Sequence, residues 1–238
     1  MSRVYLIRHG QAGTRDAYDS LSTLGRRQAR LLGEYFASQG VRFAAAYAGE
    51  LSRHRQSAEE ARAGYGAEFP ELTIDSGWNE FDLDRMYQEL APQLCAGDAH
   101  FRREYEAMRQ LVQAGAEHGD SVHRRWLPCD TTVVNAWIAR THSYGGETWE
   151  EFQQRVLSCR ARTHFMQRQN NVAVFTSATP IAIWAGLALD IQDARVMKLA
   201  GVLNNASFSM VRLRNDDLCL FSFNATPHLT SPELRTFR

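Results

Sequence analysis

The sequence predicts an α/β fold, a three-layer α/β/α sandwich around a mostly parallel sheet. Short apolar runs alternate along the chain with longer segments whose apolar residues have helical spacing. The last two apolar runs follow each other without a helix between them, and this predicts an antiparallel edge strand.

The predicted strands are short runs rich in apolar and β-branched residues. They are Arg3–Ile7, Phe43–Ala48, Leu72–Asp75, Val172–Thr176, Ser207–Leu213 and Leu218–Phe223. Between the first two strands, Thr23–Gln39 carries apolar residues at Ala29, Leu32 and Phe36, and Gly40 provides a C-terminal stop. The spacing predicts a helix over that segment.

Two later helices carry start signals. Thr148 and Glu151 form a capping box for a helix that runs to about Gln169. Pro180 fits the first turn of a helix that ends at Ala188. Both helices fit the alternation of strands and helices.

Residues 83–140 interrupt this alternation. Phe101–Ala114 has helical spacing, whereas the remainder contains Pro92 and Gly97 and is predicted to be irregular. We therefore expect one domain over residues 1–238, with 83–140 as a helical cap or insertion. Long insertions of this kind form lids or binding loops, and a helical pair packed beside the sheet is the alternative.

Composition narrows the choice of partners and compartment. Lysine plus arginine and aspartate plus glutamate each number 27, so no net charge favours nucleic acid or a membrane surface. The four cysteines are scattered, which indicates reduced thiols, and the N-terminus lacks a basic-then-apolar leader. We expect a cytoplasmic protein without nucleic-acid or membrane partners, and the sequence leaves a homodimer open.

The first predicted strand ends in Arg8-His9-Gly10. Ligands of open α/β sheets bind at the carboxyl ends of strands. Arginine suits an oxyanion, histidine can act as nucleophile or base, and glycine lets the backbone approach a ligand closely. The tripeptide thus indicates a phosphate site.

Further motifs follow in a fixed order. They are Leu21–Gly25, Leu51–Ala58, Asn79–Asp82, Gly145–Trp149, Asn205–Ser207 and Asn224–Leu229. With Arg8-His9-Gly10, this series resembles the histidine phosphatase superfamily, the phosphoglycerate-mutase-like enzymes. The resemblance spans nearly the whole chain except the region from about Leu83 to Arg140.

The resemblance and the chemistry of phosphoryl transfer imply the same roles. Such a transfer needs a neutral nucleophile, donors for the equatorial oxygens and an acid for the leaving group. The resemblance implies that His9 is the nucleophile, that Arg8 and Arg53 hold the oxygens, and that Glu80 is the acid. Arg53 lies on a predicted helix, Ser52–Arg62.

Gly10 and Gln11, which follow His9, are expected to contact the substrate. One position departs from the family pattern, because Ser177 stands where the family usually has a second histidine after the fourth strand. A serine hydroxyl can still donate one hydrogen bond to a phosphoryl oxygen. The backbone N–H of Ala178, at a helix N-terminus, could supply part of the field.

No metal or cofactor is predicted. The other histidines, His54 among them, have no zinc-ligand spacing, and neither a P-loop nor a Gly-x-Gly-x-x-Gly turn is present. We expect a cofactor-independent phosphatase that acts on a phosphorylated small molecule through a phosphohistidine on His9. The alternatives are a phosphoglycerate-type mutase, for which His123-Arg124-Arg125 could bind a second acidic group, and a catalytically weak relative that binds phosphorylated ligands.

Overall fold

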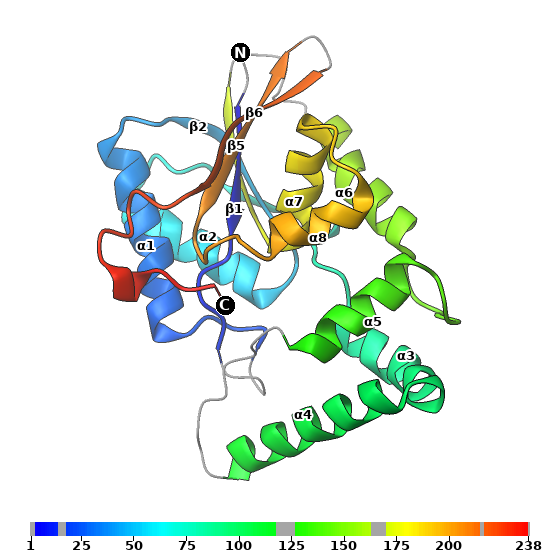
Figure 1. Cartoon of the computed structure of the whole chain (residues 1–238). Helices are drawn as coiled ribbons and strands as arrows, with labels where there is room; N and C mark the ends of the chain where they lie inside the picture. Colours follow the sequence, from blue (N-terminus) through cyan, green and yellow to red (C-terminus); the bar gives the residue numbers. More distant parts are fainter. Residues whose placement is uncertain (1–2, 14–17, 118–126, 163–169, 215–216, 238) are drawn as a thin grey trace. The chain divides into compact units, whose positions relative to one another are not determined.

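The computed structural model describes residues 3–13, 18–117, 127–162, 170–214 and 217–237. Within these residues the chain forms one six-stranded sheet in the order β3-β2-β4-β1-β5-β6 (Figure 1). The strands are β1 Arg3–Arg8, β2 Phe43–Ala48, β3 Leu72–Ile74, β4 Asn171–Thr176, β5 Phe208–Arg214 and β6 Asp217–Ala225. All six were predicted from the sequence, with ends that differ by at most two residues.

The helices are α1 Thr23–Ser38, α2 Ser52–Tyr65, α3 Leu83–Gly97, α4 Ala99–Glu117, α5 Pro128–Ile138, α6 Trp149–Arg162, α7 Ala178–Ala188 and α8 Asp193–Ala200. The predicted capping box is present at α6, where the Glu151 carboxylate accepts from the Thr148 N–H and the Thr148 hydroxyl accepts from the Glu151 N–H. The prediction that this helix continues to Gln169 concerns residues outside the described ranges.

The direction of the strands sets where a site can form. Strands β1, β2 and β3 run parallel to β4 or to each other, and β5 pairs antiparallel with both β1 and β6. The predicted mostly parallel sheet with antiparallel pairing at one edge is therefore confirmed. Because the four parallel strands point the same way, their carboxyl ends share one edge of the sheet.

The chain divides into two compact units. The first, Met1–Gly13, Ala17–Glu80 and Arg155–Arg238, contains the sheet, and the second is Thr14–Asp16 with Phe81–Gln154. In the first unit, α1 and α2 cover one face of the sheet, while α7 and α8 cover the other (Figure 1). The three-layer arrangement is thus confirmed.

The face of the sheet under α1 and α2 buries an aromatic cluster. The Tyr5 ring meets Phe36 and Phe43 edge-on, with centroids 5.4 and 5.3 Å away. Phe36 and Phe43 also pack edge-on at 5.2 Å. Each such pair contributes about 0.5–1.5 kcal/mol beyond burial. This cluster fixes α1 on β1 and β2.

Two glycines let backbones approach closely around this layer. A Cβ on Gly33 of α1 would lie 1.9 Å from the carbonyl oxygen of Ala61 in α2. A Cβ on Gly10 would lie 2.3 Å from the carbonyl oxygen of Gly25. The turn after β1 therefore rests directly on the first turn of α1.

The second unit contains α3, α4 and α5, and here the sequence prediction was partly wrong. Phe101–Ala114 lies within α4 as expected, but α3 and α5 also form in segments predicted to be irregular. Pro92 was read as a breaker, yet it lies inside α3 on the exposed side, opposite the buried Met86, Leu90 and Leu94. Burial of that apolar face outweighs the hydrogen bond that proline cannot donate.

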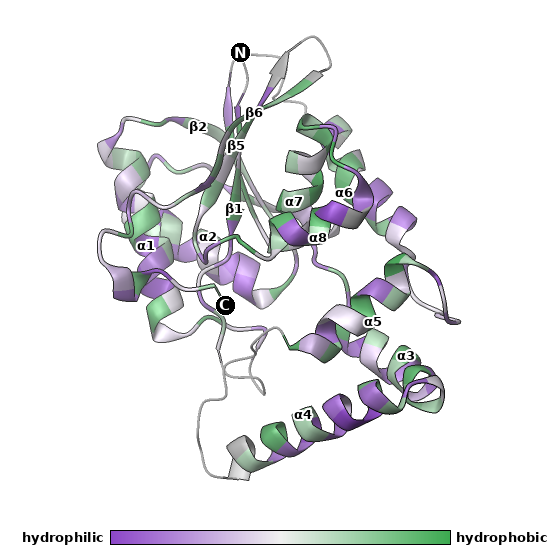
Figure 2. Ribbon diagram, viewed as in Figure 1, coloured by the Kyte–Doolittle hydropathy of each residue, from purple (hydrophilic) through white to green (hydrophobic). Residues whose placement is uncertain are grey.

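Hydropathy follows the same logic of burial. Helix α7 is apolar along most of its length (Figure 2), and its residues from Thr179 to Gly186 are all buried. Helix α4 instead alternates hydrophobic and hydrophilic residues (Figure 2). Among the described residues, no helix has both the length and the hydrophobicity needed to cross a membrane.

Candidate active site

The carboxyl ends of β1 and β4 bring His9 and Ser177 to the same edge of the sheet. In the parallel register Arg8 pairs with Thr176, so the next residues, His9 and Ser177, leave neighbouring strands together. The His9 N–H donates to the Thr176 carbonyl at 2.9 Å, which extends this pairing by one step. The site is thus built on a strand end rather than on a free loop.

His9 is buried, with 2% of its surface exposed, and one of its ring nitrogens contacts the protein backbone. Nδ1 lies 2.7 Å from the carbonyl oxygen of Gly10. A carbonyl can only accept, so Nδ1 carries the hydrogen. In the neutral ring the lone pair is then on Nε2, the nitrogen available for nucleophilic attack.

Burial and charge keep this ring neutral. Burial lowers the pKa of His9 well below 6.5, and the positive charges of Arg53 and Arg8 lower it further. A protonated imidazole has no lone pair to attack phosphorus. The two arginines suited to hold an anion therefore also favour the neutral form of the ring.

A network of hydrogen bonds holds the turn that carries His9. The Gly10 N–H donates to the Ser57 hydroxyl at 3.0 Å, and that hydroxyl donates to the Arg53 carbonyl at 2.7 Å. On the other side, the Ala206 N–H donates to the His9 carbonyl at 3.0 Å. Helix α2 and the segment just before β5 thus fix the backbone around His9.

Arg8 is 8% exposed, and backbone carbonyls hold its guanidinium. It donates to the carbonyl of Leu203 and, at 3.1 Å, to that of Phe237. Both acceptors are neutral carbonyl oxygens, and these two hydrogen bonds fix the position of the guanidinium group.

Arg53 is 7% exposed and lies on the first turn of α2. Its Nη1 donates to a carboxylate oxygen of Asp19 at 2.9 Å, and its guanidinium lies 5.0 Å from the centre of the Tyr18 ring. Within the described part of the chain, the buried Nε–H of Arg53 has no hydrogen-bond acceptor. A buried donor of this kind favours an anionic ligand.

Glu80 lies beyond the carboxyl end of β3, after one turn of 3-10 helix at Ser76–Trp78. Its side-chain oxygen accepts the backbone N–H of Thr179 at 3.2 Å. The Glu80 carboxyl group therefore lies at the first turn of α7, where it contacts Thr179, two residues after Ser177. Ala178, between them, is half-buried.

The sequence reasoning missed His54 as a residue of this site. The His54 side chain is fully buried, its ring centre lies 5.8 Å from that of His9, and its Nε2 lies 2.7 Å from the Ser177 Oγ. Burial and the charge of Arg53 lower its pKa well below 6.5. The available signal was its position directly after Arg53, which places it one helical step from a predicted phosphate ligand.

A missing side chain makes room for His54. A Cβ on Gly49, the residue after β2, would lie 2.4 Å from the Nδ1 of His54. Any other residue at position 49 would displace the imidazole. The glycine at position 49 therefore leaves the space that the buried His54 ring occupies at the sheet edge.

Gln11 is directed toward the protein. Its N–H donates to the Gln28 side chain at 2.8 Å, and its side-chain oxygen accepts from the Ser22 hydroxyl at 2.8 Å. These bonds join the turn after β1 to the start of α1. A substrate contact by Gln11 stays a prediction.

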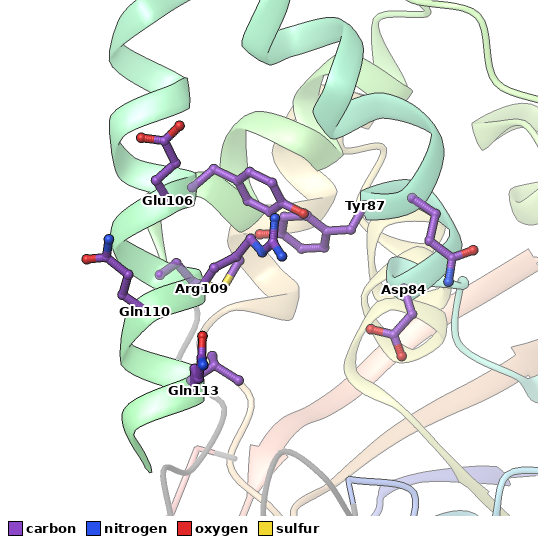
Figure 3. A pocket seen from close by; sticks show the side chains of 10 residues that line it. Asp84, Tyr87, Glu106, Arg109, Gln110 and Gln113 are labelled. Carbon is purple, nitrogen blue, oxygen red and sulfur yellow. The ribbon is translucent and has the colours of Figure 1, made fainter. Parts of the chain in front are cut away.

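The second unit has an open hollow of about 630 Å³ between α3 and α4 (Figure 3). Its lining consists of Asp84, Tyr87, Gln88, Tyr105, Glu106, Met108, Arg109, Gln110, Val112 and Gln113. Among these described lining residues Arg109 is the one cation, and two acidic residues accompany it, so they are poorly suited to bind a phosphate. The cluster His123-Arg124-Arg125 lies outside the described residues.

No group of three or more histidine, cysteine, aspartate or glutamate side chains in the described ranges could hold a metal ion. The sheet edge carries the guanidinium groups of Arg8 and Arg53, the neutral ring of His9 and the carboxyl group of Glu80.

Comparison with known families agrees with this arrangement. The family model of the histidine phosphatase superfamily (branch 1) matches residues 4–137 and 130–226. The chain belongs to this superfamily. Membership of a superfamily of phosphatases and mutases supports a phosphoryl-transfer enzyme.

Solved structures with the same fold have low sequence identity. The alpha-ribazole phosphatase from Shigella flexneri is 17% identical with a TM-score of 0.59, over 94% of this chain and 96% of that one. A phosphoserine phosphatase from Entamoeba histolytica is 15% identical with a TM-score of 0.58, over 96% and 100%. A phosphoglycerate mutase from Bacillus anthracis is 15% identical with a TM-score of 0.59, over 95% and 94%. No curated protein sequence matches the chain.

The buried neutral histidines predict how stability depends on pH. Burial lowers the pKa of His9 and His54 well below 6.5 and that of His228 to about 4. Between about pH 6.5 and the folded-state pKa values, the unfolded chain binds protons that the folded chain does not. Stability is therefore complete above pH 6.5 and should fall as the pH is lowered, by up to about 1.4 kcal/mol per pH unit for each histidine.

Urea unfolding at pH 7.5, 6.5, 5.5 and 5.0 would measure this slope. The variant His228→Gln should have a shallower slope, because it removes one of the three groups. A free energy of unfolding that does not change over this range would contradict the assignment of neutral buried rings.

Proposed function

We propose that the protein is a cofactor-independent phosphomonoesterase that transfers the phosphoryl group of a small-molecule ester to His9 and then to water. The observation that carries the proposal is the hydrogen bond from Nδ1–H of His9 to the Gly10 carbonyl, which leaves Nε2 as the nucleophile. In the first step Nε2 forms a bond to phosphorus while the bond to the ester oxygen breaks. Glu80 gives its proton to that departing oxygen.

In the second step, water attacks phosphorus and the bond to Nε2 breaks. Glu80, now a carboxylate, takes the proton from water, so both residues return to their starting state. Arg8 and Arg53 hold the equatorial oxygens in both steps. The effect of both charges on the pKa of His9 is consistent with this role, because it places them near the ring. Inorganic phosphate is the product.

Two other functions share this site. A mutase would return the phosphoryl group to another oxygen of its substrate instead of to water. A binding protein would use Arg8 and Arg53 but would not turn over. Hydrolysis is the simpler proposal, because it needs one anion site beside His9, whereas a mutase also has to exclude water and hold a second acidic group of its substrate.

The variant His9→Ala should lose activity by at least about 10³-fold, because it removes the nucleophile. The measurement is steady-state hydrolysis of para-nitrophenyl phosphate by the whole chain. His100→Ala provides a matched control, since this histidine lies on α4 with its side chain 72% exposed. It should match the parent.

Hydrolysis that survives in His9→Ala would contradict the mechanism. Phosphate binding without any turnover in the parent would indicate the binding protein. Exchange that depends on a bisphosphorylated primer, with the phosphoryl group retained on the substrate, would indicate a mutase.

Glu80→Gln should lower the hydrolysis of alkyl phosphates by roughly 10²–10⁴-fold, because glutamine cannot protonate the leaving oxygen. The loss should be much smaller for aryl esters with acidic leaving groups, which depart without a proton. Rates across a series of esters with graded leaving-group pKa would measure this difference. An equal loss across the series would assign Glu80 to binding or to the support of α7.

A further inference from the structure

The contact between His54 and Ser177 joins two buried polar side chains that are 123 residues apart in the sequence. His54 lies on the first turn of α2, and Ser177 follows β4. Both are at most 2% exposed. Burial of two polar groups is unfavourable unless they are hydrogen-bonded, so the contact at 2.7 Å has to satisfy both of them.

Ser177 is the N-cap residue of α7, but its hydroxyl does not cap the helix. A serine at this position usually accepts a backbone N–H of the first turn. Here the Thr179 N–H donates to Glu80 instead, and the Ser177 hydroxyl turns to His54. An oxygen of the Glu80 carboxyl group accepts this N–H in place of the serine, which leaves the serine hydroxyl for the sheet edge beside His9.

The two nitrogens of His54 indicate how the pair is arranged. Nδ1 has no hydrogen-bond partner among the described residues, and Nε2 contacts Ser177. A buried N–H without an acceptor is rarer than a buried acceptor without a donor. The ring hydrogen therefore belongs on Nε2, where it donates to the Ser177 oxygen. The serine's own hydrogen is then free to point elsewhere.

We propose that His54 is a positioning residue of the phosphoryl site: its Nε2–H donates to the Ser177 oxygen and directs the serine hydroxyl hydrogen at a phosphoryl oxygen held beside His9. This inference rests on the proposed function, in which a phosphoryl group lies against His9. The strand register supports it, because His9 and Ser177 follow paired residues of β1 and β4.

The charges around the pair explain why a neutral relay suits this site. Arg8 and Arg53 already place two positive charges at the sheet edge, and both lower the pKa of His9. A third cation there would be repelled by them and would depress the nucleophile's pKa further. A histidine that acts through a serine supplies another hydrogen-bond donor without another charge.

A double-mutant cycle tests the inference in the full chain. His54→Met removes the donor while it keeps an unbranched side chain, and His54→Gln keeps an N–H near the position of Nε2. Ser177→Ala removes the hydroxyl. The readouts are kcat and KM for para-nitrophenyl phosphate, and the Kd for inorganic phosphate by titration calorimetry.

We expect Ser177→Ala to lower kcat by about 10²-fold and His54→Met by about 10-fold. The double variant His54→Met/Ser177→Ala should equal Ser177→Ala alone, because His54 acts only through that hydroxyl. His54→Gln should recover most of the loss. A purely structural role of His54 would give no recovery and no dependence on Ser177.

Multiplicative losses in the double variant, or a folded His54→Met as active as the parent, would overturn the inference. If His54→Met does not fold, nitrogen-15 NMR of the parent decides between the outcomes. The Nε2–H of His54 should be observed and should shift when inorganic phosphate binds, and this shift should vanish in Ser177→Ala. A hydrogen on Nδ1, or no shift, would overturn it.

The two proposals fail separately. If the parent binds phosphate but does not hydrolyse the ester, the proposed phosphatase activity is contradicted. The double-mutant cycle, measured through the Kd for inorganic phosphate, then still tests the positioning role of His54. A parent that hydrolyses the ester, with kcat and Kd unchanged in His54→Met, contradicts the relay alone.

Discussion

The hydrogen bond from the His9 ring to the carbonyl of its neighbour Gly10 is the interaction on which the site depends. It costs the chain little, since donor and acceptor are adjacent in sequence, and it decides which ring nitrogen can act. Its geometry requires the turn after β1 to hold one shape. That shape is fixed by the bond from Gly10 to Ser57 and by the backbone of Gly25, which leaves no space for a Cβ at position 10.

The same edge of the sheet balances two electrostatic demands. A phosphoryl group needs positive charge, whereas the nucleophile has to stay neutral. The structure meets both with two arginines beside buried histidines, because the arginine charges and burial act in the same direction on the pKa of His9. Arg53 is satisfied in part by Asp19, whose side chain is 50% exposed.

Much of the fold could be predicted because its signals are local. Each strand is a short apolar run, and the helices α1, α6 and α7 begin or end at capping residues, a proline or a glycine. Helix α3 was missed because Pro92 is a strong local breaker, and only packing shows that it lies on the exposed side. Burial in the second unit overrides the local signal.

In the candidate site, too, residues with a local sequence signal could be predicted, whereas contacts that depend on the fold could not. His9, Arg8 and Arg53 were predicted because each sits at a strand end or in a recognisable motif, and in the structure the charges of Arg8 and Arg53 lie near enough to His9 to lower its pKa. His54 was considered only as a metal ligand, and its contact with Ser177 could not be predicted, since it depends on the parallel register of β1, β2 and β4. The sequence places Ser177 at the sheet edge, but its partner His54 lies on α2, far away along the chain.

The location of the phosphoryl group during turnover tests the account most directly. Phosphohistidine is stable in base and labile in acid, so the reaction with para-nitrophenyl phosphate should be quenched in base and the protein analysed by peptide mass spectrometry. The account predicts one added phosphoryl group on His9. A phosphoryl group on Ser177, where His54 would then act as a base for a serine nucleophile, would contradict it.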